Sequence, residues 1–327
     1  MSREQEIAGF LARHGYATAR VEPLAQDASF RRYWRIRGGP RPAVLMDAPP
    51  PEDVAPFLRI GAYLARVGLS VPDILAADVA AGLVLEEDLG DALLSALPPR
   101  EDLFDAAVDV LAAIQRAAPP ADLPAWGAAE MSATALATLF DWWWPAAFGV
   151  PAPEAARRDF ADALAALLAP VAAGPVCFVH RDFFPGNLLW LADRPGIRCL
   201  GVIDFQGAGL GHPAYDLVSL IQDARRDIPA PLAERALARY LAARPELDGP
   251  DFHAAFIACA AQRHLRVSAQ WVRLAQRDGR PGYLVHGSRT WRLLGQALRH
   301  PAAAPLAAAM DRWIPPEYRA NPRGVAA

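Results

Sequence analysis

One histidine, two aspartates and one asparagine stand at spacings that suit phosphoryl transfer. His180, Asp182 and Asn187 follow an apolar run at 177–179, and Asp204 ends a second apolar run at 200–203. A carboxylate can orient or accept the proton of an attacking hydroxyl, and carboxylate and amide oxygens bind a hard cation. This set therefore indicates transfer of a phosphoryl group from a nucleotide.

The spacing predicts how these side chains are brought together. Asp182 and Asn187 are five residues apart, which a short loop can span, and 22 residues separate Asp182 from Asp204, enough for one β-hairpin. We expect strand, tight loop, strand, a turn at 193–196 and a third strand, with the polar side chains at the mouth of one small sheet. Asp182 would be the proton acceptor, and Asn187 and Asp204 the Mg²⁺ ligands.

Two further residues are expected to hold the loop. His180 is interpreted as structural, bonding to backbone, although a buried core histidine is the alternative. Asp216 is predicted to cap the loop backbone from the start of the following helix. A lone aspartate at a strand end is most often a turn residue. Asparagine, however, occurs only twice in the chain, at 187 and 321, so its place in this pattern favours function.

The first 90 residues predict a small antiparallel sheet with one inserted helix. Ser2 and Gln5 have the spacing of a capping box for a helix that reaches residues 14–15. An amphipathic helix is expected after three prolines at 49–51, with apolar residues at helical spacing from 54 to 67. The expected strands are 19–24, 30–37, 43–47, 74–78 and 82–86.

The rest of the chain, residues 91–327, predicts a mostly helical lobe that includes the catalytic loop. Helical periods and alanine enrichment cover 103–117, 131–144, 154–168 and nearly everything after 215. The change of composition near residue 90 divides a β-rich lobe from an α-rich lobe. Ligands usually bind in the cleft between two such lobes.

Composition excludes several classes of function. The net charge of −3 gives no basic field for nucleic acid or an anionic membrane. The three cysteines have no CxxC spacing and are expected to be buried free thiols. The polar N-terminus is unlike a signal peptide, no apolar run is long enough to span a membrane, and we expect a cytoplasmic protein. All 33 basic residues are arginine, which excludes a catalytic amine.

The motif HxDxxxxN followed by Ile-Asp-Phe resembles the aminoglycoside phosphotransferase family, relatives of choline kinases with a two-lobed protein-kinase-like α+β fold. The order of the two lobes extends the resemblance over nearly the whole chain. Short strings at 27–36, 46–50, 87–91, 180–183 and 215–220 are similar to a bacterial branch of this family. That branch contains kinases for the anomeric hydroxyl of N-acetylmuramate and N-acetylglucosamine in cell-wall recycling.

The resemblance implies two nucleotide-binding segments. Residues 85–89, with Glu86, Glu87 and Leu89, would be the hinge whose backbone bonds the adenine edge; a linker with solvated acids is the alternative. The loop 27–31, with Ser29, Phe30 and Arg31, would cover the phosphates through its backbone N–H groups. It contains no glycine, and an ordinary hairpin loop is an equal alternative.

Met46 departs from the family pattern. The third strand normally carries a lysine that pairs with the nucleotide phosphates, and this chain has none. Arg31, Arg32 and Arg35 are the candidate substitutes, because a guanidinium group binds phosphate in a bidentate manner. A solvated strand face is the alternative for these arginines. An inactive relative would also lack the lysine, but such proteins usually lose the metal ligands as well.

The acceptor is expected to bind the helical lobe. Trp142 and Trp143 belong to three consecutive tryptophans, which cannot all face the core of a helical lobe. One could stack on a sugar, and a plug of the core is the alternative. Gln206 and Arg263 are further acceptor candidates. An arginine there could pair with a lactyl carboxylate or an amide oxygen, while a surface ion pair is the default.

Together these features predict an ATP- and Mg²⁺-dependent kinase that acts on the anomeric hydroxyl of N-acetylmuramate, N-acetylglucosamine or both. We expect a monomer that binds an amino sugar and a nucleotide, without a nucleic-acid or membrane partner. A kinase for another acceptor, such as an aminoglycoside or an amino alcohol, is the alternative within the class. A nucleotide-binding regulatory module without turnover is the alternative outside it.

Overall fold

The computed structural model describes residues 2–24 and 31–325. The chain divides into two compact units, each described here by itself. The first comprises Met1–Leu97 with Gly186–Gly207, and the second Pro98–Pro185 with Ala208–Ala327. The division falls after Leu97 rather than after residue 90, and it gives the first unit a segment that the sequence interpretation had placed in the helical lobe.

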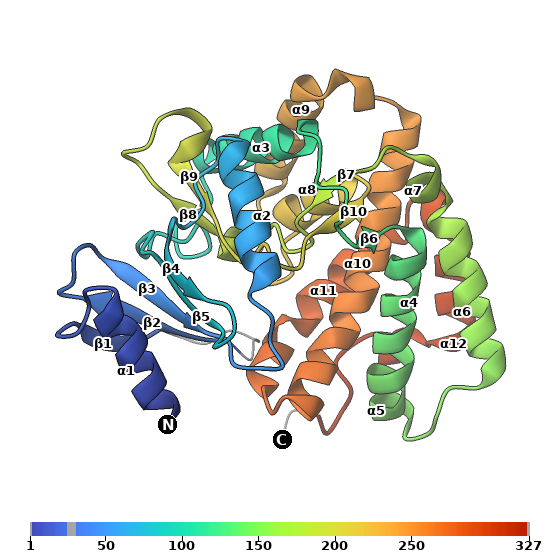
Figure 1. The fold of residues 1–327 in the computed structure, drawn as a ribbon. Coiled ribbons are helices and arrows are strands. Elements are labelled where there is room, and N and C mark those ends of the chain that lie inside the picture. The colour runs from blue at the N-terminus through green and yellow to red at the C-terminus, as the bar shows by residue number, and fades with distance from the viewer. Residues whose placement is uncertain (1, 25–30, 326–327) are drawn as a thin grey trace. The chain divides into compact units, whose positions relative to one another are not determined.

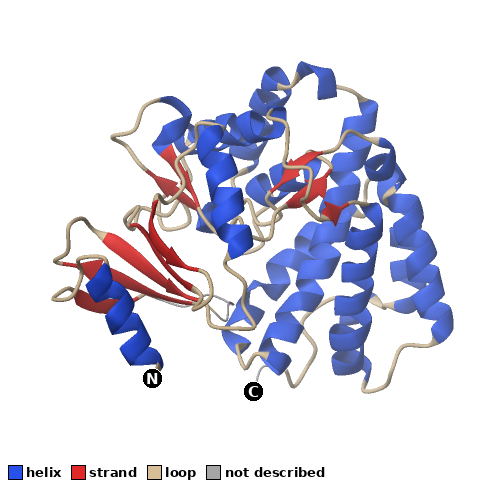
Figure 2. Cartoon of the chain, viewed as in Figure 1, coloured by secondary structure: helices blue, strands red, loops and turns tan. Residues whose placement is uncertain are grey.

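The first unit is built on a five-stranded antiparallel sheet with the order β1-β2-β3-β5-β4 (Figures 1 and 2). Helix α2, Ala55–Arg66, lies between β3 and β4 in the sequence, as predicted. Asp53 Oδ1 accepts the Ala55 N–H at 2.8 Å just before this helix begins. The strands are β1 Arg20–Pro23, β2 Arg32–Arg37, β3 Ala43–Asp47, β4 Ile74–Asp78 and β5 Leu83–Glu87.

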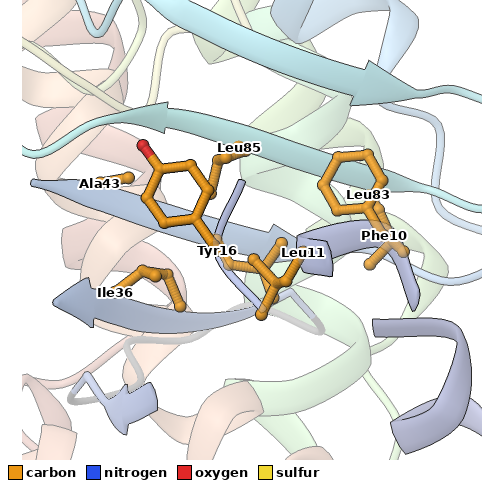
Figure 3. Close-up of a cluster of buried hydrophobic side chains, with 8 residues drawn as sticks. Phe10, Leu11, Tyr16, Ile36, Ala43, Leu83 and Leu85 are labelled. Carbon is orange, nitrogen blue, oxygen red and sulfur yellow. The ribbon is translucent and has the colours of Figure 1, made fainter. Parts of the chain in front are cut away.

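Helix α1, Arg3–Arg13, covers one face of this sheet and begins at the predicted capping box. Ser2 Oγ accepts the Gln5 N–H, and the Ser2 N–H donates to Gln5 Oε1. Because side chains alternate along a strand, Ala43 of β3 and Leu83 and Leu85 of β5 lie in one cluster with Phe10 and Leu11 of this helix (Figure 3). The buried cluster consists of Phe10, Leu11, Tyr16, Ile36, Ala43, Leu45, Leu83 and Leu85. The alternate residues of the same strands therefore carry the opposite face, where polar side chains gather.

A β-hairpin from the middle of the sequence completes the first unit. Its strands are β8, Leu188–Trp190, and β9, Leu200–Val202, with the short helix η3, Gly196–Cys199, between them. Backbone hydrogen bonds tie it to earlier segments: Val202 N–H donates to Ser70 O at 2.9 Å, and Leu94 N–H to Leu188 O at 2.8 Å. These long-range bonds are the physical reason why the hairpin belongs to the first unit.

The second unit is mostly helical, as predicted (Figure 2). Its longest helix, α10, Pro250–Arg277, packs against α4, α8 and α11. Residues 258–265 in the middle of this 28-residue helix are all buried, so the helix runs through the interior of the unit and gives it central support. The other helices are α3 Glu101–Arg116, α4 Ala128–Thr138, α5 Trp144–Phe148, α6 Glu154–Leu167, α7 Ala169–Ala173, α8 Ala214–Ile221, α9 Ala230–Ala243, α11 Gly287–Ala297 and α12 Ala304–Trp313.

The helix predicted at 131–144 is interrupted. Between α4 and α5 the chain forms one π-helical segment, η1, Leu139–Trp143. Thr138 Oγ1 donates to Thr134 O at 2.9 Å, so a side chain shares a carbonyl of the helix ladder. Pro145 has no N–H to continue that ladder. These two residues account for the local change of helical pitch.

A second small sheet, which belongs to the second unit, precedes the loop that carries His180 and Asp182. Strand β7, Cys177–Val179, pairs with β10, Gly209–Gly211, which in turn pairs with β6, Ala125–Trp126. The prediction that the strands around the motif form one small sheet is therefore wrong. β7 belongs to this three-stranded sheet, whereas β8 and β9 pair only with each other as a sheet. Neither β6 nor β10 was predicted, because β6 has only two residues and β10 is Gly-Leu-Gly, which carries little strand signal.

Composition predicted that no segment spans a membrane and that the cysteines are buried thiols. None of the helices in the described ranges is both long and apolar enough to cross a lipid bilayer. The cysteines carry thiols, of which Cys177 and Cys259 are buried as expected, whereas Cys199 is partly exposed. Burial raises the pKa of the Cys177 and Cys259 thiols, so both stay protonated at neutral pH.

Candidate functional site

Asp216 holds the backbone of the loop that carries Asp182. In the first turn of α8, its two carboxylate oxygens accept the N–H groups of His180 at 2.6 Å and Arg181 at 2.9 Å. The predicted contact between Asp216 and the loop is therefore present. Burial raises the pKa of Asp216 to about 7, and the two N–H donors oppose this shift. The donors fix the loop end through two charge-assisted hydrogen bonds when the carboxylate is ionised.

His180 lies inside the second unit rather than on its surface. It is 1% exposed, and its ring meets that of Phe183 edge-on at 5.9 Å between centroids. The residue after it, Arg181, has a positive φ of 74° and places its guanidinium 3.8 Å from the centre of the Trp126 ring. This tight turn leaves Asp182 exposed, as a residue that must reach a substrate requires.

Asn187 and Asp204 are brought together in the first unit. They lie at the same end of the β8–β9 hairpin, where Ile203 N–H donates to Asn187 O at 3.1 Å. The Asn187 Nδ2 atom lies 3.5 Å from Asp204 Oδ2. The spacing in the sequence predicted that Asn187 and Asp204 lie close together, and the register of the hairpin brings them there.

The backbone at Asp204 is held in an unusual conformation by its neighbours. Its φ is 60°, and the next residue, Phe205, stacks on Phe57 of α2 at 4.9 Å between ring centroids. Gly61 of α2 leaves room for this ring, because a Cβ atom there would lie 3.2 Å from it. Gln206 Nε2 donates to Asp204 Oδ1 at 2.7 Å. Gln206 thus orients the carboxylate in this structure.

This pair suits a magnesium ion better than a transition metal. One carboxylate and one amide supply hard oxygen donors, and Mg²⁺ takes its remaining ligands from water and phosphate. The described residues contain no cluster of three or more His, Cys, Asp or Glu side chains that could hold a metal by themselves. An ion at Asn187 and Asp204 would therefore need a phosphate-bearing ligand to complete its shell.

The three candidate arginines have different surroundings. Arg32 Nη2 donates to Asp47 Oδ2 at 2.6 Å, on the face of the sheet that α1 covers, and Arg3 also pairs with Asp47. Arg35 is held by two carboxylates, with Nη2 2.8 Å from Asp91 Oδ1 and Nε 2.8 Å from Asp88 Oδ2. Both guanidinium groups are thus engaged in ion pairs away from position 46.

Arg31 lies on the same face of the sheet as Met46. Tyr33 is the Cα partner of Met46 across β2 and β3, and Arg31 is hydrogen-bonded to the Tyr33 side chain. Arg31 Nε also donates to Glu52 Oε2 at 3.2 Å. Asp204 acts electrostatically on Tyr33, whose pKa is raised by burial first and then by Glu86 and other charges. Strand alternation puts Arg31 and Arg35 on the face of Met46, and Arg31 is the one that contacts Tyr33, the cross-strand neighbour of Met46, while it also pairs with Glu52.

The hinge candidates differ from a solvated linker. Glu86 is 6% exposed within β5, and burial raises the pKa of its carboxyl to about 8. Glu87 Oε1 accepts a hydrogen bond from Arg194 Nη2 at 2.7 Å, and Leu89 is partly exposed. The alternative of solvated acids therefore does not hold for the Glu86 side chain. Ser29 and Phe30 lie outside the described residues.

The acceptor candidates divide into core and accessible residues. Trp143 is fully buried, with its ring 5.3 Å from that of Trp291 and its Nε1 donating to Ala320 O at 3.0 Å. This environment makes Trp143 a core residue, as the alternative interpretation expected. Trp142 is partly exposed. Arg263 is buried on α10, so the default of a surface ion pair does not apply to it.

Some residues of the site escaped sequence reasoning. Tyr33 was missed although alternation along a strand, Arg31-Tyr33-Arg35, could have placed it beside the candidate arginines. Tyr215, next to Asp216, was also missed; its hydroxyl accepts a hydrogen bond from Arg266 at 3.1 Å. No sequence signal links Tyr215 to Arg266, because 51 residues separate them.

Comparisons with known proteins find relatives over most of the chain. A family model described as "Phosphotransferase enzyme family" matches residues 20–255. The N-acetylmuramate/N-acetylglucosamine kinase of Caulobacter vibrioides is 36% identical, over 97% of this chain and 98% of its own. The Pseudomonas aeruginosa protein of the same name is 36% identical, over 88% of this chain and 87% of its own. A choline kinase structure from Streptococcus pneumoniae shares the fold, with a TM-score of 0.63 at 14% identity, over 92% of this chain and 98% of that one.

Proposed function

Because the chain belongs to the phosphotransferase enzyme family, we propose that it transfers the γ-phosphoryl group of ATP to the anomeric hydroxyl of N-acetylmuramate and N-acetylglucosamine. The observation that carries this proposal is 36% identity over nearly the full length of both chains with a relative named for these two sugars. The chain also carries Asp182, Asn187 and Asp204 at the spacing of the phosphotransfer motif, which supports the proposal. The product would be a sugar 1-phosphate.

Asp182 is proposed to orient the acceptor hydroxyl and to take its proton. An anomeric hydroxyl is more acidic than an ordinary alcohol, so a carboxylate is a sufficient base for it. The sugar oxygen then forms a bond to the γ-phosphorus while the bond to the bridging oxygen of ADP breaks. The hydrogen bonds from the His180 and Arg181 N–H groups to Asp216 keep the loop of Asp182 in one conformation.

Asn187 and Asp204 are proposed to hold Mg²⁺ on the nucleotide phosphates. The ion would neutralise negative charge on the phosphates during transfer. Gln206 would keep the Asp204 carboxylate in the orientation that the structure has, through its hydrogen bond to Oδ1. Arg31 would supply the positive charge that a lysine supplies in other members of the family, because it lies on the face of Met46.

Further residues are proposed to bind the adenine base and the acceptor sugar. The backbone at Glu86, Glu87 and Leu89 would receive the adenine base. Trp142 is proposed to stack on the acceptor sugar, because it is the partly exposed residue of the pair predicted for this role. The monomeric state and the cytoplasmic location stay predictions.

Phosphorus NMR of the reaction products tests the proposed function. The protein is incubated with ATP, Mg²⁺ and either N-acetylmuramate or N-acetylglucosamine, and a sugar 1-phosphate signal that grows with ADP is expected. A 6-phosphate signal would refute the anomeric position. Release of ADP that neither sugar stimulates would favour a nucleotide-binding regulatory module, and stimulation by an amino alcohol alone would assign another acceptor.

A further inference from the structure

Arg263 is a buried cation without a hydrogen-bonding partner in the described part of the chain. It lies in the middle of α10, and its side chain is 4% exposed. Its Nε and Nη1 atoms are buried and make no hydrogen bond to any described residue. No carboxylate of the described residues forms an ion pair with it either, although the same unit contains many arginines that are paired.

Such an arrangement is costly unless another molecule completes it. Taking an ion out of water costs several kcal/mol in a protein interior, and only an opposite charge or good hydrogen bonds offset that cost. Guanidinium groups cannot lose their proton to escape the cost. The carboxylates of Asp182 and Asp223 offset part of the charge of Arg263, but its Nε and Nη1 donors stay without acceptors. These unsatisfied donors indicate a ligand group that accepts hydrogen bonds.

The residues around Arg263 connect it to Asp182. The charge of Asp182 acts on both Arg263 and Arg266, one helical turn apart on α10. Arg266 is fixed by two hydrogen bonds, from Nη2 to the Tyr215 hydroxyl at 3.1 Å and from Nη1 to Gln270 Oε1 at 2.7 Å. Arg266 thus already has neutral partners, whereas Arg263 does not. All of these residues belong to the second unit.

The two sugars in the names of the relatives differ by one charged group. N-acetylmuramate carries a lactyl ether with a carboxylate on O3, where N-acetylglucosamine has a hydroxyl. O3 is two ring carbons away from the anomeric carbon. A sugar whose anomeric hydroxyl lies at Asp182 therefore carries its lactyl group within one sugar length of that carboxylate.

We propose that Arg263, with Arg266 beside it, binds the lactyl carboxylate of N-acetylmuramate and so sets the preference between the two acceptor sugars. This inference rests on the proposed function. The carboxylate would supply the hydrogen-bond acceptors that Nε and Nη1 lack, in the bidentate geometry that guanidinium and carboxylate groups favour. N-acetylglucosamine, which has only a neutral hydroxyl there, would gain less from Arg263.

The test compares kcat/KM for both sugars in the wild type and in Arg263→Met. A charge-assisted hydrogen bond contributes about 1.5–3 kcal/mol, so the ratio of N-acetylmuramate to N-acetylglucosamine should fall by about 10- to 100-fold. Arg263→Lys keeps the charge without the planar fork and should restore part of the ratio. The matched control is Arg273→Met, a partly buried arginine of the same helix on whose charge Asp182 does not act, and its ratio should equal that of the wild type.

Thermal unfolding separates ligand binding from a structural role of the charge. Arg263 lowers the pKa of the buried Asp216 and Asp223 carboxyls, so Arg263→Met should lower the melting temperature, whereas Arg263→Lys keeps the charge and should unfold near the wild-type temperature. If Arg263→Met does not fold, the affinities of Arg263→Lys for the two sugars, measured by calorimetry, give the same comparison without turnover. A lower preference for N-acetylmuramate in that variant would support the proposal.

An unchanged ratio in a folded Arg263→Met would overturn the inference, as would an equal loss for both sugars, which would place Arg263 on a part that the sugars share. In either case the wild type would still phosphorylate both sugars, so the proposed function would stand. A wild-type protein that phosphorylates neither sugar would instead refute the proposed function and this inference with it.

Discussion

Arg181 and Asp204 adopt a backbone conformation that side chains other than glycine rarely take. Their φ values are 74° and 60°, and they are the non-glycine residues with positive φ in the described ranges. Such a conformation costs on the order of 1–3 kcal/mol, so the surrounding contacts must hold it. Asp216 does so for Arg181 through a hydrogen bond, and Phe205 on Phe57 does so for Asp204. Each strained residue lies beside or at a carboxylate of the proposed mechanism.

Replacing Asp182 by asparagine tests the proposed base. The variant keeps the size and hydrogen-bonding shape of the side chain but cannot accept the proton. We expect turnover to fall by about 10²- to 10⁴-fold, because this is the usual contribution of a general base. Nucleotide affinity, measured by calorimetry with a non-hydrolysable ATP analogue, should remain near the wild-type value. Unchanged turnover would disprove the proposed role of Asp182.

Arg31 is predicted to replace the missing lysine. In Arg31→Met, loss of a charge-assisted contact to phosphate should raise the KM for ATP by about 10-fold or more. Arg37→Met is the control, since Arg37 ends β2, the strand that follows Arg31, and its exposed side chain pairs with Glu22. Equal values of KM in Arg31→Met and Arg37→Met would assign the phosphate contact to another residue.

At the scale of elements, the face of the sheet opposite α1 concentrates polar groups in a buried setting. Glu86 of β5 and Val44 of β3 are Cα partners, and Tyr33 and Met46 form the next pair. Strand alternation places these side chains on one face, and the register puts Arg31 at its end. A shift of one residue would exchange this face with the apolar cluster against α1.

Glu86 predicts a dependence of stability on pH. The pKa of its buried carboxyl is raised from an ordinary 4.5 to about 8 in the folded chain. Between these two pH values the folded state holds a proton that the unfolded state has lost. The contribution of Glu86 to the free energy of unfolding is therefore complete below its ordinary pKa and is lost as the pH rises through 8. Glu86→Gln cannot ionise, so its free energy of unfolding should rise relative to that of the wild type by up to a few kcal/mol between pH 5 and 9.

Urea unfolding of both proteins at the two pH values measures this difference. At pH 5 the wild type and Glu86→Gln should be of similar stability, because the wild-type carboxyl is protonated. A difference in the free energy of unfolding that is the same at pH 5 and pH 9 would show that Glu86 does not titrate in this range.

At the scale of the whole molecule, the proposed catalytic groups come from two compact units. Asp182 belongs to the second unit, and Asn187 and Asp204 to the first, with the division between Pro185 and Gly186. The proposed metal ligands are therefore part of the same unit as the sheet and Arg31. Nucleotide and metal binding are thus expected to be separable from the proton transfer at Asp182.

Thermal unfolding with ligands tests this separation. A non-hydrolysable ATP analogue with Mg²⁺ at a hundred times its dissociation constant should add about 2.7 kcal/mol to the stability of the wild type. Asp182→Asn should show the same gain, while Asp204→Asn or a chelator should remove most of it. A gain in Asp204→Asn that equals the wild-type gain would exclude Asp204 as a metal ligand.

The sequence by itself determined the order of the elements and the chemistry of the motif. Hydrophobic periods, prolines and the capping box are local signals, and they predicted the first sheet, its inserted helix and most of the helical unit. The residue types at 182, 187 and 204 indicated phosphotransfer without any knowledge of distances. Such signals depend on neighbours in the chain, which the sequence displays directly.

Only the tertiary structure decided which of several equivalent residues has the right surroundings. It separated Arg31 from Arg32 by strand face, placed Trp143 in the core and left Arg263 buried without a hydrogen bond. It also moved the β8–β9 hairpin to the first unit through bonds to Ser70 and Leu94. These outcomes depend on strand register and on partners far away in the sequence, which no local pattern encodes.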